Sequence, residues 1–264
     1  MRTIFLFTLL LSATFSWGKS VTHQVNVKRQ DMPRIAIIID DIGYRKTDHA
    51  VLTLPADFTF SILPHTPFGK SLAEQAYQAK HEIMLHIPME PMASENDHLL
   101  GAGALTVDMN EQSLRASLAS SYQEIPFAIG INNHMGSRLT QMYKPMAWTM
   151  RFLKDNNLFF LDSLTSNKSK VARVARAFDV PELSRNVFLD NQLDEKYIEK
   201  QFNRLIWLAR HSTSKSAIAI AHPHPETIEA LKVLIPRLAK ENIQLVPISA
   251  LLTTQKQLDL AASN

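Results

Sequence analysis

The chain has 264 residues, 45% of them hydrophobic, which is enough to bury one large core. The formal net charge is only +3, and no Lys/Arg cluster with interleaved aromatic side chains occurs, so the composition speaks against nucleic-acid binding. Cysteine is absent, so an exported form of the protein needs no disulfide bond.

The first 18 residues, "MRTIFLFTLLLSATFSWG", are typical of a cleavable signal peptide. Arg2 precedes an apolar run over residues 4–11, and the small residues Ser16 and Gly18 precede the expected cleavage site. Because this run is too short to span a bilayer comfortably, we expect a periplasmic or secreted protein with no stable transmembrane span after cleavage. An uncleaved N-terminal anchor is the alternative.

A polar, aperiodic linker is expected over residues 19–32, one domain over 33–254 and a C-terminal tail over 255–264. Within the domain, short apolar segments alternate with segments of helical period. Strands are predicted at residues 34–39, 58–63, 82–87, 127–132, 158–162, 186–190, 217–222 and 243–248. Helices are predicted at residues 68–80, 111–124, 144–157, 194–212 and 225–242. Continuous apolar strands separated by helices indicate an α/β fold with a parallel sheet, either a (β/α) barrel of seven to eight strands or an open doubly wound sheet.

Polar residues follow nearly every predicted strand. They are Asp40 and Asp41, His86, the run Asn132–Asn133–His134, Asp162 and Ser163, Asp190 and Asn191, and His222. The carboxyl ends of parallel strands face one rim, where active sites form, so these side chains are expected to converge. A single such residue is often only a helix cap, but capping does not explain the repetition.

The adjacent carboxylates of Asp40 and Asp41 repel each other and resist burial, and a bound cation relieves both costs. Imidazoles nearby favour zinc or a similar first-row metal over calcium or magnesium. A pair of aspartates that caps the following helix is the alternative.

Five motifs in order, "IIIDDIG", "HEIMLHIPMEP", "GINNHMGSRLT", "FFLDSLTS" and "IAIAHPHPET", resemble the divergent polysaccharide deacetylase family, a branch of the NodB-homology carbohydrate esterases. The resemblance covers roughly residues 33–252. It implies a distorted (β/α) barrel and a metal-dependent hydrolase that removes acetyl groups from an N-acetylated envelope polysaccharide or related carbohydrate.

The resemblance also implies residue roles. Asp40 is then the general base, Asp41 and His86 are metal ligands, and His222 is the general acid. The family's second motif histidine is replaced by Glu90, so His134 is inferred as the third ligand with Glu90 as its competitor. Substrate-binding or supporting roles are expected for three further residues, Asn133, Asp162 and Asp190.

Two other functions stay open. Since the second motif histidine is missing, the protein is alternatively a catalytically altered or inactive glycan-binding protein of the envelope that retains its metal. A metal-dependent phosphohydrolase is the other, because two aspartates with histidine ligands also serve phosphoester chemistry. A phosphohydrolase would favour a glycine-rich loop that binds phosphate. The chain has only seven glycines, which speaks against this alternative.

Overall fold

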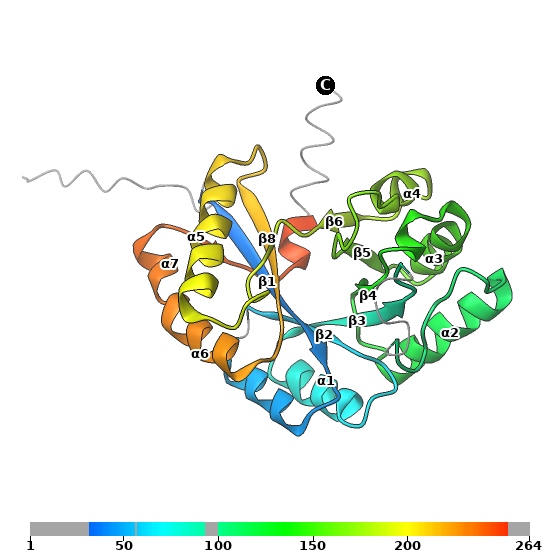
Figure 1. The fold of residues 1–264 in the computed structure, drawn as a ribbon, viewed down its shortest axis with the longest axis horizontal. Coiled ribbons are helices and arrows are strands. Elements are labelled where there is room, and N and C mark those ends of the chain that lie inside the picture. Colours follow the sequence, from blue (N-terminus) through cyan, green and yellow to red (C-terminus); the bar gives the residue numbers. More distant parts are fainter. Residues whose placement is uncertain (1–31, 56, 93–99, 253–264) are drawn as a thin grey trace, which may run out of the picture.

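The protein is described by a computed structural model that covers residues 32–55, 57–92 and 100–252 (Figure 1). The predicted signal peptide, the C-terminal tail and all but the last residue of the predicted linker lie outside these ranges. Within the described residues, none of the helices is long and apolar enough to cross a membrane.

A curled sheet of parallel strands forms the centre of the molecule, which confirms the predicted α/β barrel-like fold. The strands are β1 Arg34–Ile42, β2 Thr59–Ile62, β3 Glu82–Met89, β4 Gly130–Met135, β5 Phe159–Asp162, β6 Glu182–Ser184, β7 Val187–Phe188, β8 Ser216–Ala221 and β9 Gln244–Leu245. Their order is β6-β5-β4-β3-β2-β1-β8-β7, and β9 also pairs with β1. Because the strands are parallel, their carboxyl ends meet at one rim.

One extended segment, residues 182–188, connects the two edges of the sheet. Its first part, β6, pairs with β5, and its second part, β7, pairs with β8. Only Arg185 and Asn186 separate the two parts, and their backbone N–H groups bond to Asp162 and Ile218 of the two edges. The barrel is therefore distorted here. Of the strand predicted at residues 186–190, the structure forms only β7, Val187–Phe188.

Helices cover the outside of the sheet (Figure 1). They are α1 Gly69–Gln78, α2 Glu111–Glu124, α3 Tyr143–Asp155, α4 Val171–Ala177, α5 Glu195–His211, α6 Pro225–Leu234 and α7 Arg237–Lys240, with 3₁₀ turns η2 Lys46–Thr53 and η4 Leu139–Gln141. Asn110 and Asp194 begin α2 and α5 by accepting the backbone N–H three residues ahead. The prediction of one continuous helix at 225–242 was wrong, because Pro236 interrupts it.

Alternate residues of the strands face two separate apolar cores. In β1, Ile35, Ile37 and Ile39 belong to the core beneath the helices, whereas Ala36 and Ile38 belong to a smaller core on the inner face of the curl. The same alternation in β3, β5 and β8 places Met84, Leu161 and Ile220 on the inner face. In a regular strand, the side chain two residues further along lies on the same face. Residues two positions after these inner-face residues are therefore expected to point toward the inside of the rim.

The helix-facing core predicts unequal costs for two substitutions in α5. Phe202 is fully buried in that core, whereas Trp207 is 56% exposed on the same helix. Phe202→Ala should lower the free energy of unfolding by about 3–5 kcal/mol. Trp207→Ala, the matched control, should change it by less than about 0.5 kcal/mol. Chemical denaturation measures both, and equal losses would contradict this packing.

Candidate metal centre

An irregularity in β1 brings Asp40 and Asp41 to the same side of the strand. Neighbouring residues in a regular strand point to opposite faces, so Asp40 would follow Ile38 inward and Asp41 would point toward the helices. Pairing with β2 slips by one residue between Ile39 and Ile42, and Asp41 has the left-handed φ of 57°. This bulge re-aims the Asp41 carboxylate toward the inside of the rim, a common use of bulges beside active sites.

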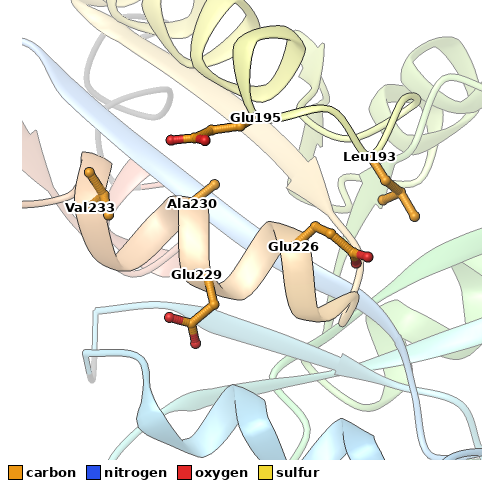
Figure 2. Close-up of a pocket in the computed structure, with 6 residues that line it drawn as sticks. All are labelled: Leu193, Glu195, Glu226, Glu229, Ala230 and Val233. Carbon is orange, nitrogen blue, oxygen red and sulfur yellow. The ribbon is translucent and has the colours of Figure 1, made fainter.

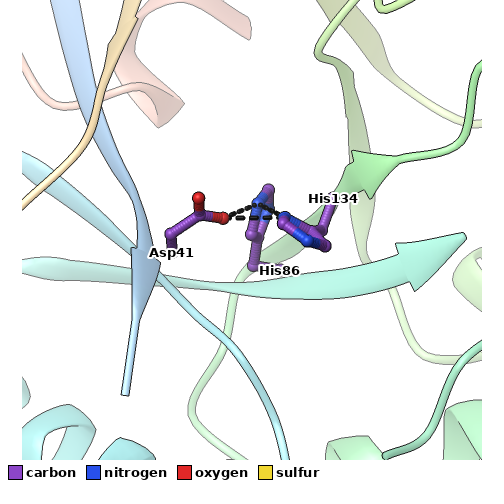
Figure 3. Close-up of side chains that lie close together, drawn as sticks. All are labelled: Asp41, His86 and His134. Atoms are coloured by element: carbon purple, nitrogen blue, oxygen red, sulfur yellow. Dashed lines mark hydrogen bonds and ion pairs between the residues drawn. The ribbon is translucent and has the colours of Figure 1, made fainter. Parts of the chain in front are cut away.

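Asp41, His86 and His134 form a cluster in which one atom from each residue converges (Figure 3). Asp41 Oδ1 lies 2.9 Å from His86 Nε2 and 2.7 Å from His134 Nδ1. The two ring nitrogens are 3.2 Å apart. His86 is two residues beyond Met84 on β3, and His134 is the next-to-last residue of the neighbouring strand β4.

The residues present fit a divalent metal ion. Donor atoms around a tetrahedral zinc lie about 3.3 Å apart, near the spacing of these three atoms. Among the described residues, Asp41 Oδ1 is a buried side-chain oxygen without an aligned hydrogen bond, although two ring nitrogens lie beside it. Burial raises the pKa of Asp41, but His134 and His86 outweigh burial and hold this pKa well below its usual value. The carboxylate is therefore ionised, as a ligand must be.

Asp40 lies beside the cluster on the inner face and is only 2% exposed. Both of its carboxylate oxygens accept hydrogen bonds from Asn132 Nδ2, at 3.0 and 2.9 Å. Burial is the largest influence on Asp40 and raises its pKa above the ordinary value, against the opposing charges of His86 and His222. A carboxylate with a raised pKa, next to a group of potential metal ligands, is suited to accept a proton.

His222 directly follows β8 and faces the cluster, and its Nε2 lies 3.8 Å from Asp41 Oδ2. Its other ring nitrogen, Nδ1, lies 2.9 Å from Asp190 Oδ1. Asp190 Oδ2 also accepts hydrogen bonds from the backbone N–H of His222 and from the hydroxyl of Thr227. Burial lowers the pKa of His222, but the carboxylate of Asp190 outweighs it and raises this pKa to about 9.

Asp190, His222 and His224 form a second group of potential metal ligands. The two oxygens of Asp190, however, already accept hydrogen bonds from His222 and Thr227. We therefore assign Asp190 to holding the His222 ring, with Nδ1 as the donor and Nε2 directed at the cluster.

The cluster opens into a hollow of about 250 Å³. It is lined by Asp40, Asp41, His86, Asn133, His134, Met135, Ser163, Thr165, Phe188, Asn191 and His222. A slightly larger hollow, about 300 Å³, is lined by Leu193, Ala230, Val233 and three glutamates and lies between α6 and the start of α5 (Figure 2). That second hollow contains no histidine, so the first hollow, which contains the cluster, is the candidate site.

Two residues expected at the site are engaged elsewhere. Glu90, the proposed competitor of His134, accepts hydrogen bonds from the backbone of Val107 at 2.6 Å and from the side chain of Arg138. Asp162 bonds to the backbone of Leu164 and the hydroxyl of Ser169, because its position in β5 alternates with the inward-facing Leu161. Both carboxylates therefore hold loops in place rather than facing the hollow.

The third supporting residue, Asn133, does line the hollow, and its amide bonds to the backbone of Ser163 and Met135. Phe188 is a wall residue that the sequence interpretation missed; its ring stacks on His222 at a centroid distance of 6.1 Å. Asn132 was seen only as one of several polar strand-end residues, and Ser61 was missed. The polar Ser61 inside the apolar "FTFSIL" was the available signal for a buried hydrogen-bond network.

The contact between Asp190 and His222 predicts a shifted titration in the metal-free protein. Because the pKa of His222 is raised from 6.5 to about 9, this contact contributes stability that is complete below pH 6.5 and is lost as the pH rises through about 9. NMR titration should show this high pKa, and Asp190→Asn should lower it toward 6.5. Thr227→Val keeps the Asp190 carboxylate and should change the pKa of His222 little. An unchanged pKa in Asp190→Asn would contradict the assignment.

Comparisons with known proteins agree with this architecture. The sequence profile of the divergent polysaccharide deacetylase family matches residues 37–252. The chain is 37% identical to the uncharacterized protein YibQ of Escherichia coli over 220 residues, which are 83% of this chain and 67% of that protein.

Two solved structures share the fold. The uncharacterized protein ATU2773 of Agrobacterium tumefaciens has 26% identity and a TM-score of 0.79, over 83% of this chain and 89% of that one. The catalytic domain of a peptidoglycan N-acetylglucosamine deacetylase from Eubacterium rectale has 12% identity and a TM-score of 0.52, over 82% of this chain and 89% of that one. With the profile match across most of the chain, these findings show that the protein belongs to the divergent polysaccharide deacetylase family.

Proposed function

We propose that the protein is a metal-dependent hydrolase that removes acetyl groups from an N-acetylated carbohydrate. The observation that carries the proposal is the placement of Asp41, His86 and His134 around one point, with Asp40 and His222 beside it in the same hollow. Three protein ligands are the usual number for a catalytic zinc, since the fourth position stays open.

A divalent metal, zinc by its ligand set, would supply Lewis acidity toward the amide carbonyl and lower the pKa of water near it. Asp40 accepts the proton of the water that attacks the acetamide carbon. Its burial and its two hydrogen bonds from Asn132 keep the carboxylate in one orientation while it does so.

His222 gives its Nε2 proton to the sugar nitrogen as the carbon–nitrogen bond breaks, because an amide nitrogen leaves poorly as an anion. The new carbon–oxygen bond from the attacking water replaces the carbon–nitrogen bond, and the products are acetate and the free amine. Asp190 stabilises the protonated form of His222, which keeps a proton available near neutral pH.

The substrate we propose is an N-acetylated glycan of the cell envelope. Three points support it: the family's sugar substrates, the peptidoglycan substrate in the name of the Eubacterium rectale neighbour, and the N-terminal signal-like segment. The same segment is the basis for proposing a periplasmic or secreted location.

A glycan-binding protein without hydrolytic activity is the second candidate. It is favoured by Glu90, which stands where ordinary polysaccharide deacetylases have a second histidine ligand and which holds a loop instead. Such a protein would bind zinc and N-acetylated glycan and release no acetate.

Substitutions at the two aspartates test the division of roles. Asp41→Ala should reduce bound zinc from about one per chain to well below that, because it removes one of three ligands. Asp40→Asn should keep the zinc and lower acetate release by about 100-fold or more, the usual contribution of a general base. Elemental analysis measures the zinc, and an enzymatic acetate assay on N-acetylated chitooligosaccharides and peptidoglycan measures turnover.

Glu90→Gln is the matched control and should keep its zinc. Zinc loss in Glu90→Gln, or full zinc content in Asp41→Ala, would contradict the ligand assignment. If the wild-type protein binds zinc but releases acetate from neither substrate, the glycan-binding function is favoured over hydrolysis.

A further inference from the structure

Asn132 lies between the cluster of proposed metal ligands and the proposed base. Its side chain is completely buried near the end of β4, opposite His86 in the register of β3 and β4. The amide makes contacts on both sides: its oxygen faces His86 and Ser61, and its nitrogen faces Asp40 and Ser163. No other amide side chain in the described residues contacts both a cluster residue and Asp40.

The amide oxygen determines which nitrogen of His86 carries the proton. Asn132 Oδ1 lies 2.8 Å from His86 Nδ1, and an amide oxygen only accepts hydrogen bonds. His86 Nδ1 must therefore be the donor. In the neutral ring this leaves the lone pair on Nε2, the atom that lies against Asp41 Oδ1 and His134 Nδ1. An outer partner of this kind fixes both the tautomer and the ring plane of a metal-binding histidine.

The amide nitrogen determines the orientation of Asp40. Asn132 Nδ2 donates to both carboxylate oxygens, at 3.0 and 2.9 Å. Among the described residues, no arginine or lysine forms an ion pair with Asp40, and His86 Nε2 is 3.7 Å away. The neutral amide is thus the main group that holds this carboxylate.

Asn132 is itself held in one orientation. The hydroxyl of Ser61 donates to its oxygen at 2.5 Å, and its nitrogen lies 3.2 Å from the hydroxyl of Ser163. Exchanging the amide oxygen and nitrogen would place an acceptor against the Asp40 carboxylate, which when ionised only accepts. The network therefore allows one rotamer, which serves both neighbours at once.

We propose that Asn132 is a positioning residue that couples the metal ligand His86 to the base Asp40 through a single amide. The proposal rests on the proposed function, since it assigns Asn132 a role in the same site. It gives the two halves of the amide separate tasks: the oxygen supports metal binding, and the nitrogen supports proton acceptance by Asp40.

Two variants separate these tasks in the full-length protein. Asn132→Leu has a similar size and removes both halves, so the zinc dissociation constant should rise about 10- to 100-fold, the usual cost of losing an outer-shell partner. Asn132→Asp keeps an oxygen for His86 Nδ1–H but loses the amide donor to Asp40. Its zinc affinity should therefore fall less than that of Asn132→Leu, while acetate release falls by about 100-fold or more. Competition with a chromogenic chelator measures the zinc affinity.

Ile131→Ala is the matched control, because Ile131 is the fully buried neighbour of Asn132 on β4 but faces the core beneath the helices instead of the cluster. It should leave the zinc affinity close to that of wild type. Equal weakening in Asn132→Leu and Ile131→Ala would mean a general loosening of β4 and would overturn the proposal. So would wild-type zinc affinity in Asn132→Leu.

A measurement on the wild-type protein does not depend on the folding of any variant. Nitrogen-15 NMR of the zinc-loaded protein should show the His86 proton on Nδ1, and a proton on Nε2 would overturn the proposal. Failure of the proposed function looks different: wild type would then release no acetate from N-acetylated glycans, while the zinc affinities and the tautomer would still test the role of Asn132 in metal binding.

Discussion

The site depends on one backbone constraint, the alternation of side chains along β1. A regular strand cannot direct two adjacent carboxylates to the same place. The bulge between Ile39 and Ile42, with Asp41 in a left-handed conformation, overcomes this alternation and presents Asp40 and Asp41 together. A left-handed aspartate is uncommon and costly, so it persists where the surrounding sheet enforces it.

Hydrogen bonds behind the two histidines then give each ring a direction. Asn132 accepts from Nδ1 of His86, and Asp190 accepts from Nδ1 of His222, so both rings present Nε2 to the cluster. The two acceptors differ in charge, and this difference suits different tasks. A neutral amide leaves His86 free to bind a metal, whereas a carboxylate keeps a proton on His222.

Part of this arrangement was predictable from the sequence. Apolar runs followed by polar residues indicated parallel strands, and parallel strands place their carboxyl ends together, which brings Asp41, His86 and His134 into one cluster. The separate placement of Asp162 followed from its alternation with Leu161, which only the register reveals. The network around Asn132 joins residues from four strands. The polar Ser61 in an apolar run signals a buried hydrogen-bond network, but one sequence does not identify its partners.

The central claim is that Asp41, His86 and His134 hold one zinc ion. X-ray absorption spectroscopy of the zinc-loaded protein tests it most directly, because the spectrum reports the number of imidazole ligands. The account predicts two imidazoles with oxygen donors at about 2.0–2.2 Å, and one imidazole in His134→Ala. A protein that retains no zinc, or a spectrum that still shows two imidazoles in His134→Ala, would contradict it.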